Sequence, residues 1–159
     1  MVVMIIGIIA AIAIPRLARA SASARDAALR RDLGALRSAI EIYANEHNGV
    51  FPGNAPDGQG NNAKTAEAAV NQLTLYSNAD GEVSTAHDAA HTRGPYLARV
   101  PEAPVGVNKG SRSIAIDVAN SPPAVTSDAD GWVYNPVTGE IIVNSSESND
   151  ANTRTFDAY

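Results

Sequence analysis

The sequence begins with Met1-Val-Val-Met-Ile-Ile-Gly-Ile-Ile-Ala-Ala-Ile-Ala-Ile14, a run without any charged or strongly polar residue. As an α-helix this run would be about 21 Å long, at about 1.5 Å per residue. The hydrocarbon core of a bilayer is about 30 Å thick and needs about 20 apolar residues, so the run by itself is too short to span it. Three interpretations stay open: a membrane-seeking end, the apolar part of a signal peptide, and a buried core helix.

The composition is that of a single folded domain. The chain has 159 residues, of which 45% are hydrophobic, 18% charged and 5% aromatic, and this excludes a disordered chain. The absence of cysteine excludes disulfides, a thiol nucleophile and cysteine-ligated metals. A net charge of −5 argues against bulk nucleic-acid binding, which needs many cations facing the phosphates.

Charge is unevenly distributed along the chain. Residues 16–47 contain six arginines and four acids, whereas residues 48–159 contain six cations and thirteen acids. The molecule is therefore polarised into an apolar end, a basic segment and an acidic body.

A long helix is expected to continue the apolar run through residues 16–47. This segment contains no proline and only one glycine, Gly34, and it is rich in the helix formers Ala, Leu and Arg. Asn48-Gly49 tolerates the left-handed backbone that ends helices, and Pro52 prevents the helix from resuming. A helix of about 50 residues is far longer than the usual 11 to 12, so its N-terminal half should project from the body.

One face of this helix carries an apolar stripe at spacings of four, three, four and three residues. The pattern lasts only about two heptads, which favours packing on the chain's own sheet over a coiled coil. The residues expected to pack the helix on the head are Leu29, Leu33, Leu36, Ile40 and Tyr43.

The part of the chain after the long helix predicts loops and one short helix. Residues 53–62 have loop composition, and residues 63–75 should form a second helix. Residues 77–92 are polar and are expected to be irregular. Residues 94–104 contain three prolines and should be extended, outside the centre of any sheet.

Strand patterns follow in the last third of the chain. Residues 114–118 alternate between apolar and small or polar residues, as a half-buried strand does. Residues 131–135 and 140–144 flank Pro-Val-Thr-Gly at 136–139, which predicts a hairpin. We therefore predict an α+β fold with the long N-terminal helix packed on a small antiparallel β-sheet, and a polar, loosely held tail over residues 145–159.

An acidic turn is the one candidate metal site. Ser127-Asp-Ala-Asp-Gly131 has the spacing of a calcium loop, but Val137 stands where an EF-hand needs a bidentate Glu. A non-EF calcium site using Asp128 or Asp130 stays open, beside the simpler interpretation as an Asp-rich turn.

The histidines and the known catalytic motifs give no indication of an enzyme. His87 and His91 have the four-residue spacing of zinc-binding helices, but no Glu follows His87 and the flanking segment is not convincingly helical. No nucleophile elbow, phosphate-binding loop or dinucleotide fingerprint is present. We expect no enzymatic activity and no cofactor other than a structural calcium ion.

Three segments carry a resemblance to a known family. An uncharged run with an internal Gly, closed by Ala-Ile-Pro over Gly7–Pro15 and continuing into a long amphipathic helix, resembles the N-terminus of type IV pilins and type II secretion pseudopilins. Tyr43-Ala-Asn-Glu-His-Asn-Gly-Val-Phe-Pro52 is similar to the helix-ending segment of the major pseudopilins. Residues 94–101 and 131–140 are similar to the sheet region of the same group.

The resemblance implies that this chain starts about seven residues late. Mature members of the family begin with a methylated Phe and carry a Glu inside the apolar stretch, and no residue here occupies either position. Seven further apolar residues would give a run of about 21, long enough to cross a bilayer.

The resemblance implies a filament subunit with three parts: an apolar stem over residues 1–15, an amphipathic helix over 16–47 and a head over 48–159. Its implied partners are identical subunits in a helical homopolymer, inner-membrane lipid before assembly, a prepilin peptidase and an assembly platform. Its implied location is the inner membrane, then an extracellular filament or a periplasmic pseudopilus. The residues expected in the filament core are Met1, Val2, Val3, Met4, Ile5, Ile6, Gly7, Ile8, Ile9, Ile12, Ile14 and Pro15.

Three further expectations concern variation within this scheme. In family filaments the helix loosens over the segment that corresponds to residues 7–15, while a simple kink is the alternative. A membrane-anchored monomeric binding or sensor module is the alternative function. Five arginines are expected to bind anionic lipid, to pair with acids of adjacent subunits, or to form a solvated face: Arg16, Arg19, Arg25, Arg30 and Arg31.

Overall fold

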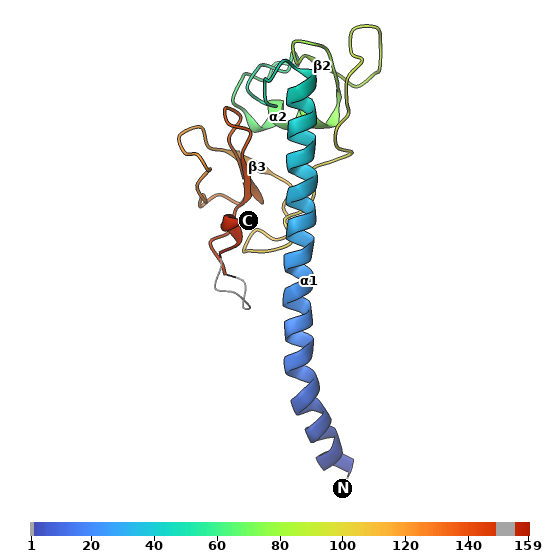
Figure 1. Ribbon diagram of the computed structural model, residues 1–159, viewed down its shortest axis with the longest axis vertical. Helices are drawn as coiled ribbons and strands as arrows, with labels where there is room; N and C mark the ends of the chain where they lie inside the picture. Colours follow the sequence, from blue (N-terminus) through green and yellow to red (C-terminus); the bar gives the residue numbers. More distant parts are fainter. Residues whose placement is uncertain (1, 149–154) are drawn as a thin grey trace.

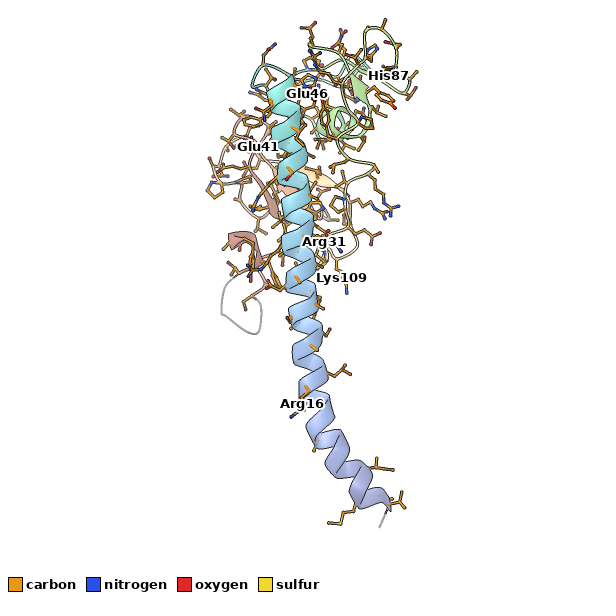
Figure 2. All side chains as sticks on the ribbon, turned by 45° about the vertical axis from the view of Figure 1, so that its right-hand side comes forward. Arg16, Arg31, Glu41, Glu46, His87 and Lys109 are labelled. Atoms are coloured by element: carbon orange, nitrogen blue, oxygen red, sulfur yellow. The ribbon has the colours of Figure 1, made fainter. Side chains whose placement is uncertain are left out.

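One helix, α1 (Val2–Glu46), runs the length of the molecule, and the remaining chain packs beside its C-terminal half (Figure 1). The computed structural model describes residues 2–148 and 155–159, and within α1 it leaves out the side chains of residues 5, 8–10, 12–15 and 18–19. The axis of α1 changes direction close to Arg16 (Figure 2). Pro15 precedes this residue, and a proline inside a helix removes one backbone donor and kinks the axis.

The end of α1 follows from its sequence. Asn48 and Gly49 have positive φ angles of 55° and 82°, the left-handed conformation that stops a helix. The amide of Gly49 donates to the carbonyl of Ala44 at 2.8 Å, which satisfies one of the last helical carbonyls.

The apolar stripe of α1 lies in the hydrophobic core. Each of its five residues is at most 2% exposed. Its neighbours in the core include Leu73 of α2 (Ala66–Thr74), Trp132 and Tyr134 of β4 (Trp132–Tyr134), and Ile141 of β5 (Ile141–Val143). The head is therefore a sheet and a short helix laid against one face of the C-terminal half of α1.

The second helix is shorter than predicted. α2 begins at Ala66 because the hydroxyl of Thr65 accepts the amide of Ala68 at 3.3 Å, as an N-cap does. The preceding residues 63–64 belong to a turn, in which Lys64 has a φ of 64°.

The prediction of an irregular segment over residues 77–92 was wrong in part. A short antiparallel hairpin forms there from β1 (Tyr76–Ser77) and β2 (Val83–Ser84). Its turn is fixed by the side chain of Asn78, whose Oδ1 accepts the amides of Asp80 and Glu82 at 3.0 Å each.

The prediction of an antiparallel sheet was also wrong for one of its strand pairs. β3 (Ile114–Ile116) pairs in parallel with β4, which pairs antiparallel with β5. The two strands of the predicted hairpin are β4 and β5. Residues 117–131 return the chain to the end of the sheet at which β3 begins. A connection of this length permits a parallel pair, which a tight turn does not.

The strand predicted over residues 114–118 ends early. The amide of Asp117 still donates to the carbonyl of Tyr134 at 3.0 Å, but the Asp117 carboxylate then accepts the amides of Ala119 and Asn120. This side-chain turn diverts the chain from the sheet and leaves Val118 about half exposed, at 49%.

Part of the tail is anchored, contrary to the expectation of a loosely held segment. The 3₁₀ helix η1 (Phe156–Ala158) places the ring of Phe156 in the core. Arg37 of α1 donates to the main-chain oxygen of Tyr159 at 2.9 Å and to that of Ile141 at 3.2 Å. Residues 149–154 of the predicted tail lie outside the described chain.

Candidate functional site

The N-terminal half of α1 projects beyond the head (Figures 1 and 2). Among the side chains that the structure describes, Leu29 is the first buried one, and those between residues 2 and 28 are exposed or half-buried. At about 1.5 Å per residue, this stretch is a rod about 40 Å long. Its surface is therefore available to a partner.

The apolar tip, defined as residues 2–14, presents large hydrophobic side chains at the end of this rod. Val2, Val3, Met4 and Ile6 are between 60% and 82% exposed. Contiguous exposed apolar surface at one end of a folded chain is typical of an interaction site.

The other residues predicted for the filament core are only partly described. At Gly7 a Cβ atom would have no neighbour within 4 Å, so this position of the tip faces open space. Met1 lies outside the described residues. The backbone is helical but the side chains lie outside the described set for Ile5, Ile8, Ile9, Ile12, Ile14 and Pro15.

The predicted arginines are not equivalent in the structure. Arg30 is paired with Asp26 at 3.2 Å and its guanidinium lies 4.5 Å from the centre of the Tyr159 ring, while Arg31 is paired with Asp32 at 2.9 Å. Within the described part of the chain, no carboxylate pairs with Arg16 or Arg25, and the side chain of Arg19 is not described. Of the five predicted arginines, Arg16 and Arg25 are therefore the described ones that are available to an external anion.

Asp128 and Asp130 lie in a loop whose backbone is hydrogen-bonded to the side-chain amides of two asparagines. The main-chain oxygens of both residues accept hydrogen bonds from the Asn108 and Asn144 side-chain amides, at 2.9 to 3.3 Å. A cavity of about 270 Å³ adjoins this loop. In residues 2–148 and 155–159, no group of three metal-ligating side chains occurs here or elsewhere.

The three histidines are held apart by different partners. His47 is buried, with Nδ1 2.8 Å from the carbonyl of Tyr43 and Nε2 3.1 Å from the hydroxyl of Ser77. His87 contacts the ring of Tyr76, and His91 pairs with Asp88 at 2.9 Å. The segment that carries His87 and His91 is not helical, so their spacing does not place them on one helix face.

Sequence reasoning missed Arg37, which fastens the head to the helix. Its guanidinium bridges α1 to the chain at Ile141 and Tyr159, across sequence separations of 104 and 122 residues. Its position on α1, four residues after Leu33 in the stripe, gave no sign of these partners.

Comparisons with protein-family profiles, with curated proteins and with solved structures found no match to this chain. Among the helices that the structure describes, none has an apolar stretch long enough for a bilayer.

Proposed function

We propose that this chain is a structural subunit of a helical filament of the type IV pilin and pseudopilin kind, and that its apolar tip forms the filament core. The observation that carries the proposal is the projecting tip of α1, whose described large apolar side chains are at least 60% exposed. The apolar tip is exposed, and within the described chain no other segment covers it.

The energetics favour burial of the tip in copies of itself. Removing a large aliphatic side chain from water is worth about 1.5 to 3 kcal/mol, so Val2, Val3, Met4 and Ile6 alone contribute about 6 to 12 kcal/mol before ordering costs. Identical subunits that add by an operation that does not close give a helical fibre.

Charge supports an arrangement with the heads outside. Residues 48–159 hold thirteen acids against six cations, so heads crowded around a core repel one another unless cations lie between them. Arg16 and Arg25 lie between the tip and the head and are suited to pair with acids of an adjacent head.

The finer assignment rests on the sequence resemblance. The segments similar to major pseudopilins, residues 43–52, 94–101 and 131–140, favour a secretion pseudopilus over an adhesive pilus. On this proposal the subunit is stored in the inner membrane, is processed by a prepilin peptidase and is added to the fibre by an assembly platform. A structural calcium ion at Asp128 or Asp130 is part of the same proposal.

The test is electron microscopy of material sheared from cells that express the gene, and of the periplasmic fraction of the same cells. Ile6→Asp should abolish filaments, because a carboxylate in an apolar core costs several kcal/mol unless it is paired. The matched control is Val107→Asp, which adds the same charge at a side chain that is 85% exposed on the head and should leave filaments intact.

Urea unfolding of both variants should match the parent, since neither residue belongs to the core. Normal filaments from the Ile6→Asp variant would overturn the proposal. A monomer with no filaments in any condition would favour the membrane-anchored binding module instead.

A further inference from the structure

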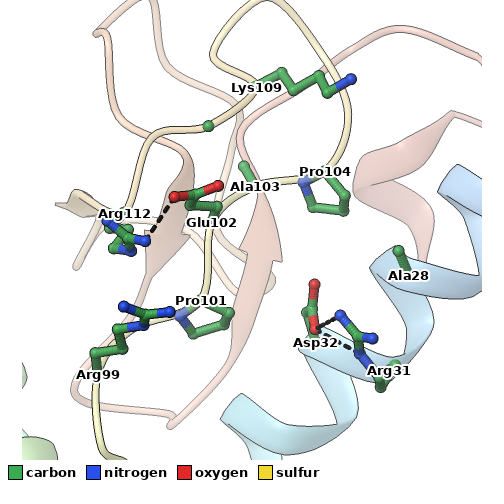
Figure 3. A pocket seen from close by; sticks show the side chains of 11 residues that line it. Ala28, Arg31, Asp32, Arg99, Pro101, Glu102, Ala103, Pro104, Lys109 and Arg112 are labelled. Carbon is green, nitrogen blue, oxygen red and sulfur yellow. Dashed lines mark hydrogen bonds and ion pairs between the residues drawn. The ribbon is translucent and has the colours of Figure 1, made fainter.

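An open cavity of about 470 Å³ lies between the middle of α1 and the loop formed by residues 99–112 (Figure 3). The helix lines it with Ala28, Arg31 and Asp32. The charged side chains that line it from the loop are Arg99, Glu102, Lys109 and Arg112. We call the surface around this cavity the basic side, because it holds four cations and two acids.

The positive charge of the basic side is only partly neutralised. Both acids are paired with arginines of the same side, at 2.6 and 2.9 Å. Within the described chain, no side-chain hydrogen bond or ion pair is made by Arg99 or Lys109. These two side chains extend over different ends of the cavity (Figure 3). The excess charge is therefore spread along a surface and does not converge on one point.

A second open cavity, of about 320 Å³, lies between α1 and the hairpin of β4 and β5. Its charged side chains are Glu41, Glu140 and Arg37. Arg37 donates to main-chain oxygens of the head, whereas Glu41 makes no hydrogen bond or ion pair within the described residues. The loop that lines this cavity at Pro122 carries a further carboxylate, Asp117. We call this surface the acidic side.

The basic side and the acidic side lie on opposite faces of α1. Ala28 and Arg37 are nine residues apart in the sequence, and so are Asp32 and Glu41. Nine residues make about two and a half turns of an α-helix, so the members of each pair point about 180° apart around the axis. They are also separated by about 14 Å along the axis, with the basic side nearer to the apolar tip.

Two different surfaces of opposite charge on one chain suit a heterologous contact between identical copies. In such a contact the basic side of one copy meets the acidic side of the next, and each copy keeps its other side free for a further copy. The axial separation of the two sides staggers neighbouring copies, so their addition continues as a helix and does not close into a ring. Contacts between two basic or two acidic sides are disfavoured by like charges.

We infer that, in the filament, the basic side of each subunit binds the acidic side of the next, with the two α1 helices parallel and staggered by about 14 Å. The inference rests on the proposed function and names the surfaces through which adjacent heads meet. Each exposed charge pair contributes little, so this contact fixes the position of neighbours while burial of the tip supplies most of the free energy. Val107, the control position for the tip, lines a different cavity with residues 125–129 and lies outside both sides.

The first test reverses the charge of each side in cells that express the gene. Arg99→Glu/Lys109→Glu on the basic side and Glu41→Lys on the acidic side should each reduce the yield of filaments at least about tenfold, because like charges then face each other. All three changes in one chain exchange the signs of the two sides and should restore the yield to within about threefold of the parent.

The control variant is Lys64→Glu/Arg93→Glu, which makes the same charge change as the basic-side variant at residues that line neither cavity. Its filament yield should stay within about twofold of the parent. Urea unfolding of all the variants should match the parent, which separates a loss of assembly from a loss of folding.

The second test is cross-linking, which the absence of cysteine from the chain makes specific. Filaments of Arg99→Cys/Glu41→Cys treated with a short bis-maleimide should give a ladder of covalent oligomers. Either single cysteine variant should give monomers only, because a heterologous contact does not bring the same residue of two copies together.

The outcomes separate this inference from the proposed function. Parent filaments that persist in both charge-reversed variants would overturn the inference and leave the proposed function standing. A loss that the combined variant does not restore would mean that the basic side meets another anionic surface, and a covalent dimer from a single cysteine variant would mean a symmetric contact. Either result contradicts the inference. A parent chain that forms no filaments overturns the proposed function and the inference with it.

Discussion

His47 is a neutral, buried imidazole at the end of α1. The carbonyl of Tyr43 accepts a hydrogen bond from Nδ1, so the proton lies on that nitrogen and Nε2 accepts from the Ser77 hydroxyl. The ring also stacks on Tyr43, with the two centres 3.8 Å apart. Burial lowers the pKa of His47 below its usual value of 6.5, and the nearby Arg93 adds to this, against the hydrogen bond to Tyr43 and the charge of Glu46.

The lowered pKa predicts a loss of stability on acidification. Below pH 6.5 the unfolded chain binds a proton at His47 that the folded chain still excludes, so the free energy of unfolding falls as the pH falls toward the folded pKa. The slope from this one group is at most about 1.4 kcal/mol per pH unit. Urea unfolding at pH 7.5 and at pH 5.5, each about one unit from the unfolded pKa, measures it.

The variant His47→Gln should flatten this dependence, whereas His87→Gln, at an exposed histidine, should keep it. An identical slope in the parent and in His47→Gln would show that another group is responsible.

Residue contacts could be predicted only where both partners lie close in sequence. The stop at Asn48 and Gly49 and the stripe of α1 follow from the local backbone and the helical period. The bond from His47 to Ser77 spans 30 residues and that from Arg37 to Tyr159 spans 122, and no local pattern encodes them.

At the scale of the element, the two halves of α1 have different surroundings. From Leu29 onward it is held by the core, whereas the described side chains before that residue are exposed or half-buried. Most helical stability in proteins comes from packing of an apolar face, and on α1 the buried face begins at Leu29, so tertiary packing stabilises chiefly its C-terminal half.

Substitution of two leucines, one in each half of α1, tests this difference. Leu36→Ala should lower the free energy of unfolding by about 2 to 5 kcal/mol, because it leaves a cavity in the core at a fully buried position. Leu17→Ala, the same change at a side chain that is 74% exposed, should alter it by less than about 0.5 kcal/mol. Chemical denaturation followed by the fluorescence of Trp132 measures both, and a comparable loss in the two variants would contradict the division.

The strands could be predicted more reliably than their directions. Alternation and the turn at residues 136–139 identified β3, β4 and β5, but the parallel pairing of β3 depends on the path of residues 117–131. Nothing in the alternation of a three-residue strand distinguishes the two directions, since side chains alternate in both.

At the scale of the molecule, the tip and the head are separable. The core begins at Leu29, so a chain that lacks residues 1–24 should fold with an unfolding midpoint close to that of the parent. It should also be monomeric without detergent, whereas the full chain should associate or require detergent. Light scattering with circular dichroism tests this, and a monodisperse full-length monomer in plain buffer would contradict it.

The candidate site could be located from the sequence, because an uncharged run of fourteen residues stands out in any chain. The cation-lined cavity could not. Arg31 lies some seventy residues before Arg99 in the sequence, and only the packing of the loop on α1 places them around one space.

The change of direction near Arg16 has a geometric consequence for whatever the tip meets. The fourteen residues beyond it form an arm about 21 Å long, so a swing of about 10° at that point displaces its end by about 4 Å. That displacement is comparable to the width of a side chain. Substitutions at this change of direction should therefore alter where the whole arm points, in addition to any contact that the substituted residue itself makes.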